Sequence, residues 1–105
     1  MSNDIAIALV SCPPEAAPHL ARTLVEARVA ACVNIIPAIQ SVYRWRNKIE
    51  ENTEALLLIK HPAAHFEALK AEVLKQHPYE LPEVIAVKLT HGHAPYLQWI
   101  LDSCT

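Results

Sequence analysis

The segment ACVNIIPAIQSVYRW (31–45) decides how this chain folds, because it is rich in β-branched and aromatic residues and is interrupted only by Pro37. A strand of about 15 residues at about 3.3 Å per residue spans about 50 Å. A domain of about 100 residues has a radius of gyration near 13 Å, so this strand is expected to extend beyond the body. Residues 46–49 then turn the chain, and Asn47 tolerates the positive φ of a tight hairpin. Pro37 lacks an N–H and is expected to bend or bulge the strand; the alternative is two short strands with a loop at Pro37.

The segments on either side of this hairpin predict an α+β fold. In chain order they are a wholly apolar strand, a helix opened by prolines, the long strand, an apolar return strand, a second helix, a fourth strand and a terminal helix. They occupy Ile5–Val10, Pro13–Arg28, Ala31–Trp45, Glu54–Lys60, the residues from Pro62, Leu81–Thr90 and the residues from Pro95. This order is that of the ferredoxin-like split βαβ arrangement, with two helices covering one face of a four-stranded antiparallel sheet. At 105 residues, the whole chain (1–105) is expected to form a single domain.

The end of the hairpin carries side chains that do not suit water. Tyr43 and Trp45 alternate with Val42 and Arg44, so the two aromatic rings are expected on one face of the ribbon. A protruding ribbon with exposed aromatic side chains is an aggregation hazard unless another subunit covers it. We therefore expect an oligomer that is built through this arm.

Composition narrows the function and the compartment. Apolar residues make up 52% of the chain, the formal net charge is −2, and the basic residues are scattered, so neither a nucleic-acid nor a membrane surface is expected. The three cysteines form no C-x-x-C pair, which favours a reducing compartment, the cytoplasm. The stretch LVSC (9–12) looks like a processing site, but only a short apolar run precedes it, so it is interpreted as a buried strand.

Two long segments, LVEARVAACVNIIPAIQSVYRWRNKIEE (24–51) and HPYELPEVIAVKLTHGHAPYLQWI (77–100), resemble the CutA divalent-cation-tolerance proteins. The resemblance implies a ferredoxin-like subunit in a tight homotrimer, a link to divalent-metal tolerance with copper binding, and no established enzymatic reaction. It also implies that Cys12 and His77 are the metal-binding positions. The chain departs from the family at Asn47, where relatives usually have glycine, and at Gln76, where some relatives have a second histidine.

The chemistry of Cys12 and His77 suits copper or zinc better than magnesium or calcium. The alternative is that Cys12 has only a structural role as a small buried apolar side chain, since cysteine is among the most buried residue types. His77 precedes Pro78, which disfavours helix, so it is equally a helix terminator. Cys32 is expected to pack in the core, and Cys104 is expected to be frayed and without a role.

The stretch QHPYELPEV (76–84) has a second, functional interpretation. His77, Tyr79 and Glu83 would be held rigidly around a cleft, where a carboxylate orients an imidazole for metal binding or general-base work. His91 and His93 are one residue apart and form only a weak chelating pattern, since a metal site needs three or four ligands.

The other histidines and the acidic run after the turn are expected to be solvated. The histidines are His19, His61 and His65, and the acidic residues are Glu50, Glu51 and Glu54, beside Lys48. In an oligomer, Glu50 is expected to pair with Arg44 or Arg46 of a neighbour. An exposed pair of this kind contributes under ~1 kcal/mol.

Three classes of function remain open at this stage. The chain has one glycine and contains no glycine-rich phosphate loop, no H-E-x-x-H and no G-x-S-x-G, so it is not expected to be an enzyme. A metal-tolerance protein is the leading hypothesis. A trimeric signalling protein similar to PII, which binds a small metabolite between subunits, is the second. An acid–base enzyme that uses His77, Tyr79 and Glu83 is the third.

Overall fold

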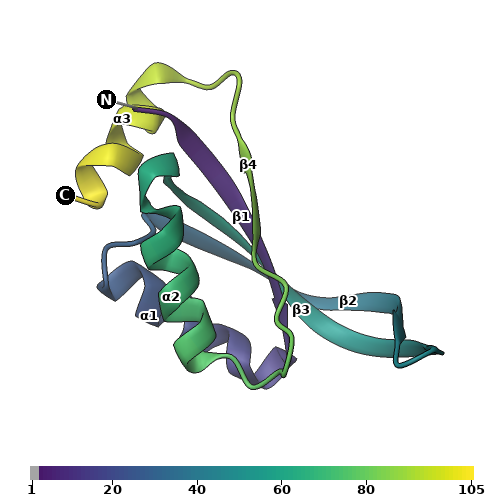
Figure 1. Cartoon of the computed structure of the whole chain (residues 1–105). Helices are drawn as coiled ribbons and strands as arrows, with labels where there is room; N and C mark the ends of the chain where they lie inside the picture. Colours follow the sequence, from purple (N-terminus) through teal and green to yellow (C-terminus); the bar gives the residue numbers. More distant parts are fainter. Residues whose placement is uncertain (1–2) are drawn as a thin grey trace.

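The computed structural model describes residues 3–105 and has the predicted order of elements (Figure 1). The strands are β1 (Ile5–Cys12), β2 (Cys32–Trp45), β3 (Lys48–Pro62) and β4 (Ile85–Lys88). The α-helices are α1 (Ala17–Glu26), α2 (Phe66–Gln76) and α3 (Ala94–Ser103), and short 3-10 turns precede α1 (Pro14–Ala16) and α2 (Ala63–His65). No helix in this described part is long and apolar enough to cross a membrane.

The four strands form one antiparallel sheet in the order β2-β3-β1-β4. Helices α1 and α2 lie against one face of this sheet (Figure 1). Between helices and sheet lies a core of fully buried side chains, which includes Val10, Leu24, Leu57, Ile59, Leu69 and Val73. The ferredoxin-like prediction is therefore confirmed.

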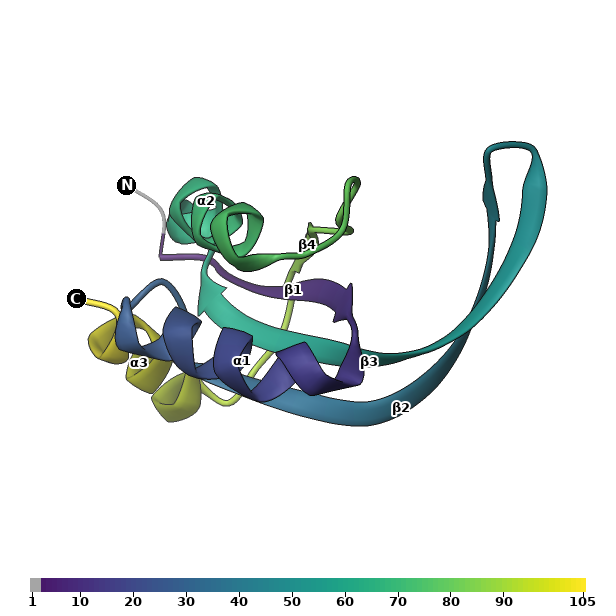
Figure 2. The ribbon, with the colours of Figure 1, turned by 90° about the horizontal axis from the view of Figure 1, so that it is seen from below.

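The long hairpin is continuous, as the segment 31–45 predicted. Strand β2 pairs with β3 from Cys32 opposite Lys60 to Trp45 opposite Lys48, with one irregularity between Ile36 and Ile39, at the position of Pro37. The hairpin leaves the body and curves (Figure 2), and it contributes to a longest dimension of 44 Å against 26 and 23 Å for the other two. A bulge at Pro37 is confirmed, and two separate strands joined by a loop are excluded.

The hairpin turn is tight, with Arg46 and Asn47 at φ of 51° and 66°. Asn47 was expected to take a positive φ, and Arg46 does so as well. The left-handed region suits asparagine better than other non-glycine residues, because its short polar side chain can bond locally.

The fourth strand is shorter than the predicted Leu81–Thr90. Only Ile85–Lys88 pairs with β1, because the segment after α2 first runs past the end of the sheet as an irregular loop. Strand β3, in contrast, is longer than Glu54–Lys60, because it includes the whole returning arm of the hairpin.

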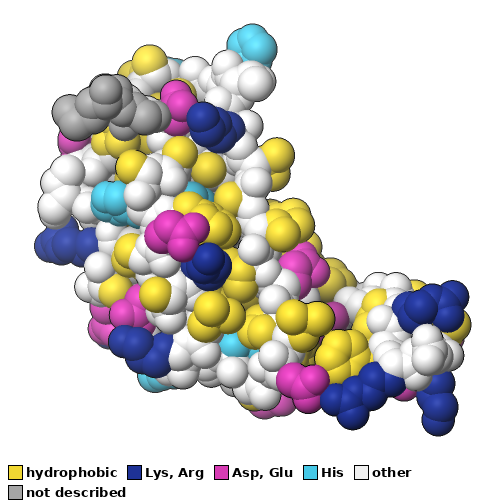
Figure 3. Space-filling view, in the orientation of Figure 1, with side chains coloured by type: hydrophobic (Ala, Val, Ile, Leu, Met, Phe, Trp, Pro, Cys, Tyr) yellow, Lys and Arg dark blue, Asp and Glu magenta, His cyan; other side chains and the backbone are white. Residues whose placement is uncertain are grey.

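Apolar side chains remain exposed on the hairpin and on β4. Val42 is 63% exposed on β2, and Ile85 and Val87 are 53% and 60% exposed on β4. Figure 3 shows hydrophobic side chains along the side of the body that faces away from α1 and α2. Both β2 and β4 are edge strands, so unpaired backbone groups lie beside these apolar side chains.

The sequence predictions for His61, Cys104 and Cys32 are wrong. His61 is fully buried rather than solvated, because it lies on the same, helix-facing side of β3 as Leu57 and Ile59. Cys104 is buried rather than frayed, since α3 carries it back to the body. Cys32, expected in the core, is only half-buried, because β2 is an edge strand.

Candidate functional site

Four segments meet at the end of the sheet where the hairpin leaves the body. Strand β1 ends at Cys12, which lies opposite Ala55 of β3, so Glu54 comes next to it along the hairpin. Helix α2 ends at Gln76 and is capped by His77, and Tyr79 follows in the loop that leads to β4. The Cys12–Tyr79 cluster, defined as Cys12, Glu54, His77 and Tyr79, thus brings together residues from distant parts of the chain.

His77 caps helix α2, and its buried ring connects strand β1 to the loop after α2. Its ψ of 133° is extended, as expected before a proline, and its backbone N–H still donates to Val73 O at 2.8 Å. Its ring Nε2 lies 2.7 Å from the backbone oxygen of Ser11, so Nε2 carries the proton and donates it. The ring Nδ1 is then an acceptor, and it receives the N–H of Tyr79 at 3.2 Å. Both ring nitrogens are therefore engaged within the chain.

Glu54 is part of this cluster. The sequence predicted a solvated side chain at this position, but Glu54 is buried. Only 6% of Glu54 is exposed, and its Oε2 accepts a hydrogen bond of 2.8 Å from the hydroxyl of Tyr79. The Tyr79 ring also packs against the His77 ring, with centroids 4.7 Å apart. Burial, and then the bond to Glu54 and its charge, raise the pKa of Tyr79 well above its usual value.

The Cys12 side chain is fully buried and carries no disulfide. Its burial raises the pKa of the thiol, and the negative charges of Glu54 and Glu15 raise it further. The thiol is therefore protonated at neutral pH, and a metal ion would have to displace this proton to bind the sulfur.

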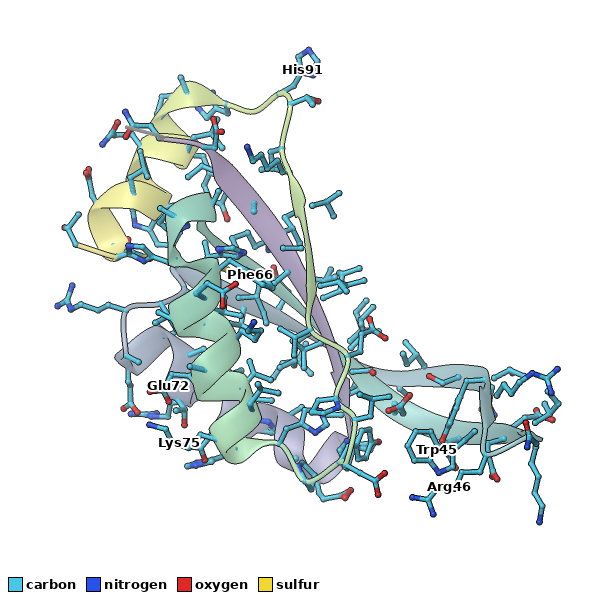
Figure 4. The ribbon with its side chains drawn as sticks, in the orientation of Figure 1. Trp45, Arg46, Phe66, Glu72, Lys75 and His91 are labelled. Carbon is cyan, nitrogen blue, oxygen red and sulfur yellow. The ribbon has the colours of Figure 1, made fainter. Side chains whose placement is uncertain are left out.

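A hollow of about 240 Å³ lies beside the cluster, between the hairpin and the loop after α2. The aromatic hollow, as we call it, is lined by Tyr43 and Trp45 from β2 and by Tyr79, Glu80 and Leu81 from the loop. Tyr43 and Trp45 thus share one face of the ribbon, as their alternation predicted. Figure 4 shows Trp45 and Arg46 projecting from the hairpin.

Arg46, at the hairpin turn, links the two walls of the aromatic hollow. Its Nη2 donates to both carboxylate oxygens of Glu80, at 3.0 and 3.1 Å. Its guanidinium carbon lies 5.2 Å from the centre of the Trp45 ring, within cation–π range. This pairing connects residues that are 34 positions apart in the sequence.

Other predicted site residues lie outside the cluster. Glu50 is half-buried on β3 opposite Tyr43, and Glu83 is exposed and is not among the residues that line the aromatic hollow. His91 and His93 are exposed before α3, and Figure 4 places His91 far from the hairpin. Within residues 3–105, no three or more His, Cys, Asp or Glu side chains are arranged to hold a metal ion. The metal-ligand role of Cys12 and His77 stays a prediction.

Sequence reasoning missed Glu54, Glu80 and the backbone oxygen of Ser11. The sequence contains a partial signal for the burial of Glu54, because this residue directly precedes the buried run of β3 and therefore lies close to the body. Nothing local to Glu80 indicates that it meets Arg46, because that contact depends on the curvature of the hairpin (Figure 2).

The fold and the cluster define a ferredoxin-like protein with a protruding hairpin, and with thiol, imidazole and carboxyl groups gathered where the hairpin begins. The sequence profile of the family described as CutA1 divalent ion tolerance protein matches residues 6–103. The chain therefore belongs to the CutA1 divalent ion tolerance protein family.

Individual relatives agree with this assignment. The chain is 41% identical to a divalent-cation tolerance protein CutA of Thermus thermophilus, over 92% of this chain and 95% of that protein. It is 48% identical to human protein CutA over 93% of this chain, but it spans only 55% of the human protein's length.

Solved structures of relatives have the same fold. CutA from Xylella fastidiosa superimposes with a TM-score of 0.94 at 41% identity, covering 97% of this chain and 99% of that one. A PII-like protein CutA from Nostoc in its apo form gives a TM-score of 0.90 at 31% identity, covering 95% and 97% of the two chains.

Proposed function

We propose that this protein binds copper or another divalent cation at the Cys12–Tyr79 cluster, as part of a divalent-cation-tolerance function. The observation that carries the proposal is the convergence of Cys12, Glu54 and His77 at one end of the sheet. Thiolate and imidazole groups suit copper and zinc, and a carboxylate adds negative charge. The names of the relatives support a connection with divalent cations.

Metal binding at this cluster requires a local rearrangement. A ring nitrogen of His77 becomes a ligand only if it releases Ser11 O or the N–H of Tyr79. The thiol of Cys12 must also lose a proton whose pKa is raised by burial and by Glu54. Binding is therefore expected to release protons and to strengthen as the pH rises.

The test is a calorimetric titration with Cu(II) and with Zn(II) against a competing chelator. It compares the wild-type protein with Cys12→Ser and His77→Ala, and with His19→Ala as the control, since His19 is exposed on α1. Saturable binding that is lost in the first two variants and kept in the third is expected. Binding that neither Cys12→Ser nor His77→Ala changes would make His77 a helix terminator only.

We also propose that the protein is a homotrimer assembled through the hairpin and the uncovered sheet face. The support is the exposure of Val42, Ile85 and Val87 beside two edge strands, which a monomer would leave in water. A domain of this size buries only about two thirds of its unfolded surface, so self-association adds burial that the single chain lacks.

We propose further that the protein acts without catalysing a reaction and resides in the cytoplasm. Both ring nitrogens of His77 are engaged, and the raised pKa of Tyr79 makes it a poor proton donor near neutral pH. The cysteines Cys12, Cys32 and Cys104 are all free, as is typical of reducing compartments. Alkylation of thiols in intact cells, followed by mass spectrometry, tests the compartment: three reduced thiols are expected, and a disulfide would contradict it.

The aromatic hollow favours a second candidate, a signalling protein that binds a small metabolite. The Nostoc relative that is called PII-like gives this candidate a precedent in name. A long mobile loop at the end of the hairpin would favour the signalling candidate, but the hairpin ends in a tight turn at Arg46 and Asn47. A thermal-shift screen of small metabolites tests it: a saturable rise in Tm that Trp45→Ala abolishes would favour this candidate over metal binding.

A further inference from the structure

Tyr79 contacts two of the three side chains that the proposed metal site uses. Its hydroxyl donates to Oε2 of Glu54 at 2.8 Å, and its backbone N–H donates to Nδ1 of His77 at 3.2 Å. The Tyr79 ring also packs against the His77 ring, with centroids 4.7 Å apart. Nδ1 has a single lone pair, which cannot accept a hydrogen bond and bind a metal ion at the same time. One residue therefore engages two of the atoms that a metal ion would need.

The ring of His77 is arranged so that Nδ1, rather than Nε2, is the nitrogen suited to a metal ion. Nε2 lies 2.7 Å from the backbone oxygen of Ser11, which can only accept, so Nε2 carries the proton. A histidine that binds a metal commonly donates its other ring N–H to a carbonyl or carboxylate, which fixes the tautomer and the ring orientation. His77 already has this arrangement. The bond from the N–H of Tyr79 is therefore the contact that a metal ion at Nδ1 would replace.

Tyr79 lies in a part of the chain that can move without breaking a helix or a strand. Residues 78–84 form the irregular loop between α2 and β4. The neighbouring Glu80 pairs with Arg46, but both side chains are largely exposed, and exposed pairs contribute little. Leu81 is 72% exposed. The bonds of Tyr79 to Glu54 and His77 are thus what ties this side of the loop to the cluster.

We propose that Tyr79 is a latch that holds the metal site closed, and that a metal ion binds by displacing Tyr79 from both Glu54 and His77. This role rests on the proposed function, because it concerns the regulation of that same site. The bonds of the latch and the bonds to the metal ion exclude each other. Whatever stability the latch adds to the closed form is therefore lost from the affinity for metal. All the bonds lie within one chain, so the latch does not depend on whether a neighbouring subunit covers the hairpin.

The test compares the affinity of the assembled wild-type protein and of Tyr79→Phe for Zn(II), measured by calorimetry against a competing chelator. Zn(II) is the probe because it has no redox chemistry and leaves the Cys12 thiol intact. Tyr79→Phe keeps the ring and the N–H and removes only the bond to Glu54, so it should bind zinc about fivefold or more tightly. The matched control Tyr96→Phe removes a hydroxyl from an exposed tyrosine of α3 and should leave the affinity unchanged.

An unchanged or lower affinity in Tyr79→Phe would overturn the latch. A tyrosine that only orients Glu54 toward a metal ion would strengthen binding, so its loss would have the opposite sign. Urea unfolding without added metal gives a second readout. Tyr79→Phe should lower the folding equilibrium constant by about the same factor as it raises the zinc affinity, because one hydrogen bond accounts for both.

Nitrogen-15 NMR of the imidazole rings tests the assignment of Nδ1 on the wild-type protein. The proton of His77 should be on Nε2 both without and with Zn(II), and zinc should shift the Nδ1 resonance. A zinc ion on Nε2 would overturn the latch, because the N–H of Tyr79 would then stay in place.

These outcomes separate the latch from the metal site itself. If Cys12→Ser abolishes zinc binding and Tyr79→Phe fails to strengthen it, the metal site stands and the latch is wrong. If neither the wild-type protein nor Tyr79→Phe binds zinc, both are wrong. Binding that is detected only in Tyr79→Phe would support both.

Discussion

The hydroxyl of Tyr79 donates a 2.8 Å hydrogen bond to the carboxylate of Glu54, across 25 residues of sequence. This bond ties the loop after α2 to the base of the hairpin. Since Glu54 is only 6% exposed, the bond also supplies a partner for a carboxylate that water barely reaches. One contact therefore joins the wall of the aromatic hollow to the Cys12–Tyr79 cluster.

Tyr79→Phe is expected to lower the free energy of unfolding by about 1–3 kcal/mol, because it leaves a buried carboxylate without its donor. Urea unfolding at a fixed protein concentration measures the change. In a Glu54→Ala background the same substitution should cost much less, since the acceptor is already gone. Equal costs in the two backgrounds would mean that the hydrogen bond contributes nothing.

The unfolding free energy is expected to fall as the pH is lowered below about 6.5, because of His61. Burial lowers the pKa of His61 in the folded state, outweighing the opposite effect of the bond from its Nδ1 to Pro62 O. The unfolded chain therefore binds a proton that the folded protein excludes. The contribution of His61 to the unfolding free energy is fully present above its pKa in the unfolded chain. It is lost as the pH falls toward its lower pKa in the folded protein, by at most about 1.4 kcal/mol per pH unit.

Urea unfolding of wild type and His61→Asn between pH 5 and 8 checks this slope. His61→Asn should show a shallower dependence on pH, whereas His65→Asn, half-buried in the 3-10 turn before α2, should largely retain it. A slope that is identical in wild type and His61→Asn would assign the acid sensitivity to other groups.

Arg28→Gly is expected to stabilise the protein by about 0.5–1 kcal/mol. Arg28 follows the end of α1 at a φ of 61°, a left-handed conformation that glycine adopts without a steric cost. The lost contact is an exposed 3.3 Å bond to Thr105 O, which contributes little. Thermal unfolding should show a higher Tm for Arg28→Gly and a lower Tm for the matched control Arg22→Gly, inside α1. A lower Tm for both would show that the side chain of Arg28 matters more than its backbone.

Ile85→Asp is expected to break the proposed homotrimer, because it places a charge on the uncovered sheet face next to an edge strand. Size-exclusion chromatography with light scattering measures the mass of the particle. The control is Val25→Asp, which introduces the same charge at an exposed position on α1, and it should keep the trimer. A trimer that persists in Ile85→Asp would exclude this face from the interface.

Glu50→Lys tests the proposed pairing between subunits at the hairpin. Since Arg46 already pairs with Glu80 within its own chain, Arg44 is the arginine of a neighbour that remains for Glu50. Because an exposed pair contributes under ~1 kcal/mol, charge reversal should raise the monomer fraction at low protein concentration in light scattering, and the second reversal Arg44→Glu should lower it again. If neither change affects the mass, Glu50 lies outside the interface.

Features that depend on the local backbone were predicted well. The irregularity at Pro37, the positive φ of Asn47 and the end of α2 at His77 all follow from what proline and asparagine permit. The length of the hairpin was also predicted from the sequence, because a run of β-branched and aromatic residues favours an extended strand.

The contacts between the residues of the site were decided by the tertiary structure. The bond from His77 to Ser11 O spans 66 residues, and the pair of Arg46 with Glu80 spans 34. The burial of Glu54 and of His61 likewise depends on which face of β3 meets the rest of the fold. Composition and spacing specify conformation over a few residues, whereas partners and burial are set by the packing of distant segments, and these decide which groups the ring nitrogens of His77 meet and which carboxylate meets a cation.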